Sequence, residues 1–556
     1  MTSGTPLWLL IGIASLALTV VACGEGEEAP TPVRTVTPAV ASPSPLATAT
    51  PAVSPGQAAV VDLANVSALL TIYAADAGDL RNDIPSVAVG DFNGDGIGDL
   101  LLGARFGDGP DNAREDAGEA YVIFGSRDLA GTVDIAAGQQ ELTILGAKPG
   151  DNLGYSVAAA DVNNDRLDDI IVSAPFSEGP AADYRTDRGE VYVIFGQSAL
   201  GGTIDIADGR QQASVVGAEG FSMLGDSIAV GDVNGDGISD MILGAPFAGR
   251  VPGSPHGGPR TELGEVYVVL GSPALSGRIS IPQGQQDFTI SGPEQWSELG
   301  DAVAVGDVNG DGIDDIIAVG EAADGPEGSR PNAGIAYVIF GSASLQGMRD
   351  TAKDEQDVTI LGADAQDALG FCAASGDVNG DAIDDIVLVA QRADGPSEGR
   401  DTAGEAYIIY GRPDLRGTID TLKGDQDITI IGADAHDLLS SCRADRDVNG
   451  DGIDDIILGS SFARGPGNSR NMAGEAYVIF GSSELGPALD LAQGGEDVVF
   501  FGAQDTDRLG AAMASGDLNG DGEEEIILVA SEAAGPANAR PGAGEVYVIA
   551  AIGEGD

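Results

Sequence analysis

Short segments that alternate between apolar and polar residues recur along the chain with a period of about 70 residues. In the third period, residues 227–231 alternate and residues 241–245 form an apolar run. A polar stretch rich in Gly and Pro follows, and then come two further segments, 265–271 and 287–292. Short runs of this kind bounded by Gly, Asp and Pro are typical of β-strands. The pattern therefore predicts four strands in each period.

A nine-residue acidic segment separates the first two predicted strands of every period. Its third copy reads Asp-Val-Asn-Gly-Asp-Gly-Ile-Ser-Asp, residues 232–240. Positions 1, 3 and 5 are always Asp, Asn and Asp, and position 9 is Asp in six copies and Glu in one. The seven copies begin at Asp91, Asp161, Asp232, Asp307, Asp377, Asp447 and Asp517.

Seven periods of four strands predict an all-β, seven-bladed β-propeller of four-stranded antiparallel blades, over residues 58–556. The last period stops after its third strand, and a strand-like segment, residues 68–73, precedes the first acidic segment. In a closed ring this amino-terminal strand would complete the last blade and remove an open sheet edge. An open solenoid would instead need capping repeats, which the sequence lacks.

The acidic segments are typical of calcium loops. Ca²⁺ takes six to eight hard oxygen ligands in a tolerant geometry. Side chains at positions 1, 3, 5 and 9 and the backbone carbonyl at position 7 would supply them, so the chain is expected to bind up to seven Ca²⁺. The alternative is a metal-free acidic hairpin, because Asp and Asn favour turns in any case. Recurrence in register in all seven periods favours calcium.

The predicted metal ligands fall into seven sets of five. They are Asp91, Asn93, Asp95, Ile97, Asp99; Asp161, Asn163, Asp165, Leu167, Asp169; Asp232, Asn234, Asp236, Ile238, Asp240; Asp307, Asn309, Asp311, Ile313, Asp315; Asp377, Asn379, Asp381, Ile383, Asp385; Asp447, Asn449, Asp451, Ile453, Asp455; and Asp517, Asn519, Asp521, Glu523, Glu525. Position 6 departs from Gly at Arg166 and Ala382. Because Glu replaces Asp at position 9 of the seventh copy, we expect that site to be the weakest.

The charge excludes one class of partner. The formal net charge is −61, from 88 acidic and 27 basic residues, and seven Ca²⁺ would leave it strongly negative. Such a field repels nucleic acid and anionic lipid head groups, so no nucleic-acid partner is expected. A saline habitat would explain the same composition.

The amino terminus predicts export and anchoring. Residues 7–22 form an apolar run that suits the core of a signal peptide, although no Lys or Arg precedes it. The run ends in Val-Val-Ala-Cys-Gly, which resembles a bacterial lipobox with Cys23 as the lipidated residue. The alternative is an uncleaved anchor. Residues 23–57, rich in Pro, Thr and Ala, predict an extended tether. We expect a lipoprotein on the outer face of the cell envelope, attached to the membrane only through its lipid.

The repeat resembles a known family. The acidic loop followed by Ile-Leu-Gly-Ala-Pro, residues 242–246, and later by Tyr-Val-Ile-Phe-Gly, as in residues 477–481, is similar to the FG-GAP repeat. That repeat builds the propellers of integrin α-subunits and of glycosylphosphatidylinositol-specific phospholipase D. The resemblance covers residues 58–556 and implies the fold and calcium binding. It says little about function, because one fold hosts several.

Two residues recur in every period outside the acidic loop. An Arg stands four residues before a Gly in all seven, and the expected role is a bidentate pair with a carboxylate of its own or the next blade rather than a ring that binds anions. A Tyr in each third strand is expected to pack between blades. The arginines are Arg114, Arg185, Arg260, Arg330, Arg400, Arg470 and Arg540, and the tyrosines are Tyr121, Tyr192, Tyr267, Tyr337, Tyr407, Tyr477 and Tyr547.

Cys372 and Cys442 occupy equivalent places, five residues before their acidic segments. The same place holds only Ser or Ala in the other periods, which favours two small, packed thiols. A disulfide between neighbouring blades is the alternative in an oxidising exterior.

The sequence favours a binding module over an enzyme. It contains two histidines and no catalytic constellation, although acidic pairs would also suit a hydrolase or lyase. The face opposite the acidic loops carries Phe221, Trp296 and a longer loop with His256, which together form a candidate ligand face. The alternative is that both rings cap the core. We expect an extracellular protein partner and an adhesion role; a glycan ligand or a purely structural subunit are the alternatives.

Overall fold

The computed structural model describes residues 58–81, 86–178, 187–218, 221–249, 263–293, 296–395 and 399–552. All of them lie in one compact unit, Leu46–Asp556. Within these ranges the regular elements are β-strands and short 3₁₀-helices, and none of the helices has the length and apolarity needed to cross a bilayer. The predicted signal peptide, Cys23, the tether and His256 lie outside the described residues.

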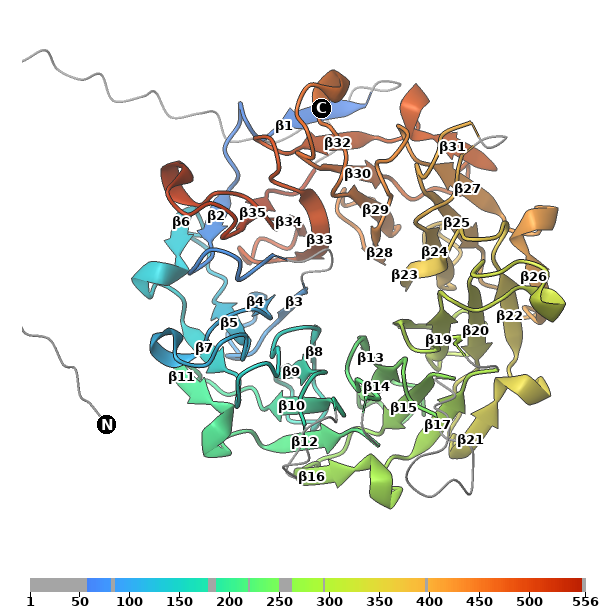
Figure 1. The fold of residues 1–556 in the computed structure, drawn as a ribbon, viewed down its shortest axis with the longest axis horizontal. Helices are drawn as coiled ribbons and strands as arrows, with labels where there is room; N and C mark the ends of the chain where they lie inside the picture. The colour runs from blue at the N-terminus through green and yellow to red at the C-terminus, as the bar shows by residue number, and fades with distance from the viewer. Residues whose placement is uncertain are drawn as a thin grey trace, which may run out of the picture. The chain divides into compact units, whose positions relative to one another are not determined.

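Seven sheets surround a central channel, which confirms the seven-bladed propeller (Figure 1). We call the strands of a blade A to E from the channel outwards. The A strands are β3 (Val87–Gly90), β8 (Val157–Ala160), β13 (Ile228–Gly231), β18 (Ala302–Gly306), β23 (Leu369–Gly376), β28 (Ser441–Arg446) and β33 (Leu509–Gly516). The B strands are β4 (Asp99–Ala104), β9 (Asp169–Ala174), β14 (Asp240–Ala245), β19 (Asp315–Gly320), β24 (Asp385–Ala390), β29 (Asp455–Ser460) and β34 (Glu525–Ala530).

Strands C and D complete the antiparallel part of each blade. The C strands are β5 (Glu119–Ile123), β10 (Glu190–Ile194), β15 (Glu265–Val269), β20 (Ile335–Ile339), β25 (Glu405–Ile409), β30 (Glu475–Ile479) and β35 (Glu545–Ile549). The D strands of blades 1 to 6 are β7 (Leu142–Leu145), β12 (Ala213–Val216), β17 (Phe288–Ser291), β22 (Val358–Leu361), β27 (Ile428–Ile431) and β32 (Val498–Phe501). Each predicted strand lies within two residues of its expected bounds.

The blades are five-stranded, so the prediction of four-stranded blades was wrong. A fifth strand, E, pairs in parallel with strand D and comes from the segment between strands C and D of the next blade. These segments begin with exposed residues and carry little apolar pattern, so only pairing with another blade makes them strands. The E strands of blades 1 to 5 are β11 (Gly202–Asp205), β16 (Gly277–Ser280), β21 (Gly347–Asp350), β26 (Gly417–Asp420) and β31 (Ala488–Asp490). Blade 7 takes β6 (Gly131–Asp134) from blade 1.

Two amino-terminal strands close the ring. β2 (Leu70–Tyr73) pairs antiparallel with β35 as strand D of blade 7, which confirms the expected closure. β1 (Ala59–Asp62), which the sequence did not predict, pairs in parallel with β32 as strand E of blade 6. The amino-terminal segment thus supplies both pieces that the carboxyl-terminal period lacks, and no D or E position in the described sheets stays empty.

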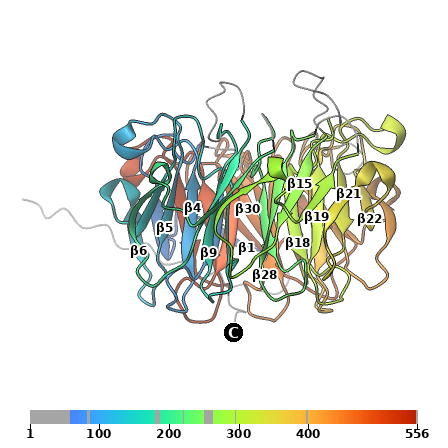
Figure 2. The same cartoon turned by 90° about the horizontal axis from the view of Figure 1, so that it is seen from below.

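The hydrophobic core consists of seven layers, each shared by two neighbouring blades. Between blades 1 and 2, for example, Leu101 and Val122 pack with Ile170 and Tyr192. Strands A to D alternate in direction within each blade, so the A–B connections lie on one face and the B–C and D–A connections on the other, while each C–D connection crosses between the faces as strand E of the preceding blade (Figure 2). We call these the lower and the upper face.

The recurring arginines hold strand E in place, as predicted for a structural role. Arg114 of blade 1 forms a bidentate pair with Asp205, the last residue of the E strand that blade 2 contributes. The guanidinium holds the pKa of Asp205 below its usual value. The equivalent pairs are Arg330–Asp420, Arg400–Asp490, Arg470–Asp62 and Arg540–Asp134. Arg185 and Arg260 lie outside the described residues.

The recurring tyrosines are buried between blades, as expected, and also carry a polar contact. Tyr267, for example, lies in the layer between blades 2 and 3, and its hydroxyl donates to Glu265 two residues earlier. Burial and this carboxylate raise the pKa of Tyr267 well above its usual value. This hydrogen bond offsets the free-energy cost of burying the hydroxyl away from water.

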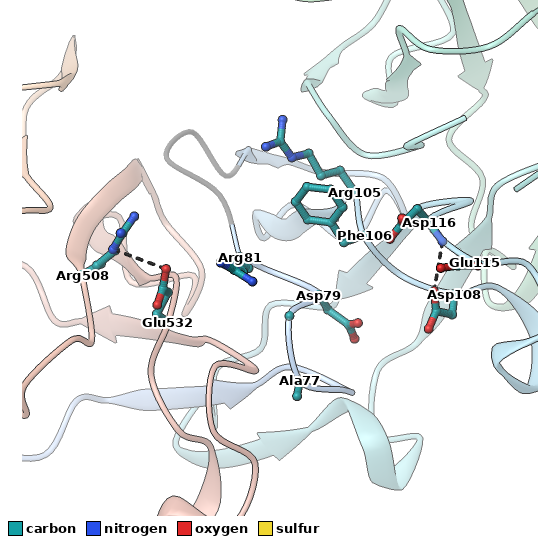
Figure 3. A pocket seen from close by; sticks show the side chains of 11 residues that line it. Ala77, Asp79, Arg81, Arg105, Phe106, Asp108, Glu115, Asp116, Arg508 and Glu532 are labelled. Carbon is teal, nitrogen blue, oxygen red and sulfur yellow. Dashed lines mark hydrogen bonds and ion pairs between the residues drawn. The ribbon is translucent and has the colours of Figure 1, made fainter. Parts of the chain in front are cut away.

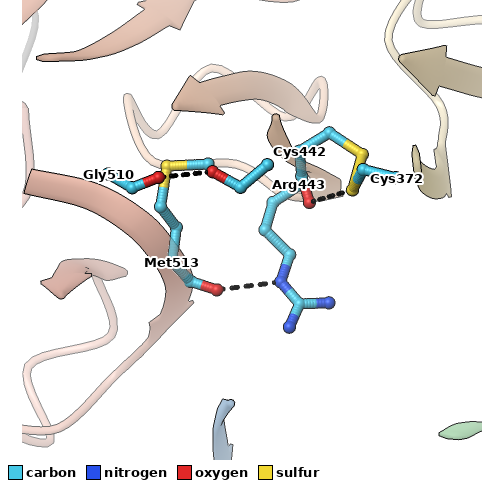
Figure 4. The surroundings of a disulfide bond; sticks show 6 residues. Cys372, Cys442, Arg443, Gly510 and Met513 are labelled. Carbon is cyan, nitrogen blue, oxygen red and sulfur yellow. Dashed lines mark hydrogen bonds between the residues drawn. A yellow bond between two sulfur atoms is a disulfide. The ribbon is translucent and has the colours of Figure 1, made fainter. Parts of the chain in front are cut away.

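Cys372 and Cys442 form a disulfide, so the expectation of two separate thiols was wrong (Figure 4). The bond joins strand A of blade 5 to strand A of blade 6, whose cysteine Cα atoms lie 6.0 Å apart. The crowding of inner strands at the channel produces this distance, and the sequence contained no measure of it. The next residue, Arg443, donates from Nε to the carbonyl of Met513 at 3.0 Å and so links blade 6 to blade 7.

Replacing both cysteines with Ser should lower the free energy of unfolding by about 2–4 kcal/mol, because the bond closes a 70-residue loop. Ser fits this place, since Ser86, Ser156 and Ser227 occupy it in blades 1 to 3. Urea denaturation with and without a reductant measures the effect, and the reductant should change only the native chain. A native protein equally stable in both conditions would contradict the prediction.

Candidate metal centres and ligand face

Each acidic loop lies on the lower face and folds around its position 1 carboxylate. In blade 3, Oδ1 of Asp232 accepts from the amides of Gly235 at 2.7 Å and Asp236 at 3.0 Å. Oδ2 accepts from Gly237 at 2.6 Å, and Asp236 in turn accepts from Ile238 at 3.0 Å. The predicted ligands at positions 1, 5 and 7 are therefore brought together in one turn.

Two backbone positions of the loop require a positive φ. Gly235 and Gly237 have φ values of 74° and 83°. Arg166 and Ala382 adopt the same conformation, at 75° and 65°, where the sequence departs from Gly. A left-handed residue with a Cβ costs roughly 1–2 kcal/mol, so the second and fifth loops form at a conformational cost that the other loops avoid at position 6.

Position 9 joins the loop to strand C. Asp240 is fully buried, and its carboxylate accepts from the amides of Val233 at 3.1 Å and Gly271 at 2.8 Å and from Asn234 Nδ2 at 3.0 Å. A Cβ on Gly271 would lie 2.3 Å from the carbonyl of Ser239, so only glycine fits there. This contact explains why a Gly follows strand C in the repeat.

Position 8 connects neighbouring loops, a role that the sequence reasoning missed. The amide of Asp232 donates to Oδ2 of Asp314 in the next blade at 2.8 Å, and the amide of Asp314 returns a bond to the carbonyl of Asp232 at 3.2 Å. The other pairs of this kind are Asp91–Asp168, Asp307–Asp384 and Asp377–Asp454. An Asp at position 8 in four of the seven copies was the available signal.

The loops supply the oxygen donors that Ca²⁺ prefers, but hydrogen bonds within the loop use them in the described arrangement. Across the described ranges, no group of three or more His, Cys, Asp or Glu side chains forms a ready metal centre. The Asn at position 3 turns its amide nitrogen towards position 9, as Asn234 does at 3.0 Å. A bound cation would require its oxygen there, and rotation of the amide exchanges the two atoms.

Electrostatics shows why a cation fits. Burial, with the carboxylates of Asp236 and Asp232 adding to it, raises the pKa of Asp240 to about 7. The same causes raise the pKa of Asp385 to about 8. The remaining position 9 residues, Asp99, Asp169, Asp315, Asp455 and Glu525, have pKa values raised to between about 7 and about 8. A carboxylate that is buried among other carboxylates is costly to ionise. A divalent cation would offset this cost, because its positive charge stabilises the ionised form.

The upper face carries the predicted aromatic residues. Trp296 is 54% exposed, and Phe221 is partly buried at the equivalent position of the preceding D–A connection. Both have a positive φ, 71° and 68°, as do the residues at this position in four other D–A connections, Gly150, Gln366, His436 and Thr506. Large aromatic residues rarely adopt this conformation, so the loop does not require a ring at this place.

Comparison with known families agrees with the repeat pattern. The family model of the FG-GAP repeat matches residues 85–123, 153–194, 224–269, 299–339 and 509–549. These segments run through strands A to C of blades 1, 2, 3, 4 and 7. The two blades without a match are those that the disulfide joins. Five of the seven blades of this β-propeller are therefore similar to the FG-GAP repeat.

Several known proteins are similar in sequence to parts of this chain. Integrin alpha pat-2 of Caenorhabditis briggsae is 29% identical over 271 residues, which are 47% of this chain and 19% of the relative. Phosphatidylinositol-glycan-specific phospholipase D of Bos taurus is 25% identical over 401 residues, 69% of this chain and 43% of the relative. Integrin alpha-PS2 of Drosophila melanogaster is 28% identical over 302 residues, which are 53% of this chain and 19% of the relative. The chain thus spans less than half the length of these relatives.

Two similar solved structures are of BBS1N in complex with ARL6DN, soaked with lead or with mercury. Their TM-scores are 0.42 and 0.39, at 10% and 9% sequence identity, over 87% of this chain and 97% of the matched chains.

The raised pKa values predict how stability depends on pH in calcium-free buffer. Position 9 carboxyls have folded pKa values near 7, above the value of about 4 in an unfolded chain. The folded state therefore binds more protons between these values, and the stabilisation is lost as pH rises through about 7. Metal-free protein should melt at a higher temperature at pH 5 than at pH 8. A melting temperature that rises with pH across this range would contradict the assignment.

Proposed function

We propose that this FG-GAP propeller is a calcium-binding module anchored to the outer surface of the cell, where its upper face binds an extracellular protein in an adhesion role. Anchoring would use Cys23 as a lipidated residue and residues 23–57 as the tether. The repeats shared with integrin α-subunits support a binding role, and the cysteine pair suits an oxidising exterior.

Calcium in this proposal has an architectural role. The position 9 carboxylate bonds to strand C, and position 8 bonds to the loop of the neighbouring blade. A cation held by positions 1, 3, 5, 7 and 9 would therefore fix the A–B turn, strand C and the next blade together. It would also neutralise clustered carboxylates at each A–B turn.

The exposed ring of Trp296 is the observation that best supports a ligand-binding role for the upper face. It is the most exposed Phe, Tyr or Trp side chain in the described residues, it has a positive φ, and it lies on a connection anchored in the ring of blades. The connection forms equally well with Gly150, Gln366 or Thr506 at the same position. A side chain that the fold does not need, held at a conformational cost, fits an anchor for a partner.

An enzymatic role is not part of the proposal, although one of the relatives is a phospholipase. The sequence offers no nucleophile with a base beside it, and the repeated carboxylates serve the loops. A glycan ligand is the second candidate, favoured by an arginine-lined pocket on the upper face.

Removing calcium should destabilise the protein strongly. We expect a chelator at neutral pH to lower the melting temperature by about 10 °C or more, because each occupied site adds binding free energy to the folded state. Differential scanning calorimetry of the intact protein with calcium, with magnesium and with chelator measures the effect. Asp236→Asn should reduce the gain from calcium, while the exposed Asp208→Asn should leave it unchanged. An identical melt with and without calcium would show that the loops bind no ion.

Replacing Trp296 should separate binding from stability. Gly accepts a φ of 71° without strain, so Trp296→Gly should preserve or slightly raise the melting temperature. Binding of the intact, calcium-loaded protein to immobilised extracellular proteins, measured by surface plasmon resonance, should fall at least about tenfold. Leu422→Gly, which removes a similarly exposed apolar side chain on another part of the ring, serves as the control. Equal binding by native protein and Trp296→Gly would reject the proposed face.

A further inference from the structure

A sevenfold repeat makes it possible to distinguish residues that every blade requires from residues that occur in a single blade. A side chain that the blade requires recurs at the same place in every blade, as the arginines paired with strand E do. A charged side chain present in only one blade is not required by the repeat itself. On the upper face, Arg81, Arg105 and Arg508 are of this second kind and line one pocket, whereas Arg188, Arg392 and Arg464, which also occur in one blade each, do not line it.

Arg81, Arg105 and Arg508 each break the repeat. Arg81 follows Leu80, where the other blades have Gly154, Gly225, Gly300, Gly370, Ser440 and Gly510. Arg105 follows strand B, where the others have Pro175, Pro246, Glu321, Gln391, Ser461 and Ser531. Arg508 precedes Leu509, where the other complete D–A connections have Asn152, Met223, Glu298, Ala368 and Leu438.

The three arginines line one pocket of about 610 Å³ at the meeting of blades 7 and 1 (Figure 3). They come from three different connections of the chain. The D–A connection that enters blade 1 has the small residue Ala77 three residues before its Leu, at the place that Trp296 takes in the connection that enters blade 4. Its volume is in the range that holds small molecules.

Aromatic rings hold two of the guanidinium groups in position. Arg105 lies over the rings of Phe106, at 4.6 Å, and Tyr155, at 4.8 Å. Arg508 lies over the ring of Phe462 at 4.6 Å, and its Nε is 3.4 Å from Glu532. Stacking uses the face of a guanidinium, whereas its N–H groups point outwards in the plane. In-plane N–H groups can donate to an oxyanion in two parallel hydrogen bonds. They would do so beside the contacts that Arg105 makes with Tyr155 and Asp226 and that Arg508 makes with Glu532.

The rest of the lining limits what the oxyanion can be. The wall also contains Asp79, Asp108, Glu115 and Asp116, which are acceptors for hydroxyl or ammonium groups. These carboxylates and the net charge of −61 repel a polyanion. Phe106 is the one large apolar side chain of the lining, so an apolar ligand gains little here. A ligand with a single carboxylate and several hydroxyl groups fits this lining, because the arginines would bind its carboxylate and the acidic side chains would accept hydrogen bonds from its hydroxyl groups.

We propose that this pocket binds a hydroxyl-rich ligand with one carboxylate, the chemistry of a uronic acid sugar, with the carboxylate held by Arg105 and Arg508. The site is separate from Trp296, so it goes beyond the proposed protein-binding role. Free sugar acids and uronic residues within a glycan share this chemistry.

Isothermal titration calorimetry of the intact, calcium-loaded protein tests the proposal with D-galacturonate and D-glucuronate. We expect at least one uronate to bind at least about tenfold more tightly than D-galactose and D-glucose. A trisaccharide with a single galacturonate and two neutral sugars that binds more tightly than the monosaccharide would identify a glycan as the source, and equal affinity would identify the free acid. Absence of uronate binding, or equal binding of the neutral sugars, would overturn the proposal.

Variants locate the binding. Arg105→Met and Arg508→Met keep the aliphatic part of each side chain over its ring, and each should weaken uronate binding at least about tenfold without a change in melting temperature. Arg349→Met, which removes an exposed arginine from β21, should bind uronate like the native protein. Trp296→Gly should also keep uronate binding, so the two proposed sites succeed or fail separately. Unchanged affinity in Arg105→Met and Arg508→Met would exclude this pocket.

Discussion

The structure depends on one buried carboxylate in each blade, at position 9 of the acidic loop. Asp240 and its equivalents lie at the start of strand B with essentially no exposed surface. In blades 1 to 6 the side chain accepts a hydrogen bond from the amide of the Gly that follows strand C. Because the position 8 Asp of four blades accepts from the loop of the preceding blade, this local arrangement also sets how those neighbouring blades meet.

Ring closure depends on strands that pair across blades. Each E strand belongs in sequence to one blade and in space to the blade before it, and an Arg–Asp pair fixes its end. The amino-terminal segment repeats this arrangement with β1 and β2, and Asp62 pairs with Arg470 in the same way as Asp205 with Arg114. The point where the two chain ends meet is therefore built from the same contacts as every other junction.

The two faces of the propeller differ in how strictly they follow the repeat. The lower face is nearly uniform, with the same loop in every blade, whereas the upper face varies from blade to blade. Its departures include the exposed ring of Trp296 and the three arginines between blades 7 and 1. Both lie on connections whose backbone the fold fixes but whose side chains it leaves open, which is where binding residues are expected.

The sequence by itself determined the number of blades, the strands A to D, the closing strand β2 and the set of oxygen donors in each loop. Those features are local: alternation, turn residues and a nine-residue spacing carry them. The tertiary structure decided the rest. The E strands and β1 have weak patterns of their own and become strands only by pairing with another blade. The disulfide depends on the distance between two inner strands, and the position 8 bonds depend on how adjacent loops meet. Arg81, Arg105 and Arg508 are 427 residues apart along the chain at their extremes. Only the closed ring, which brings blade 7 beside blade 1, places them around one pocket.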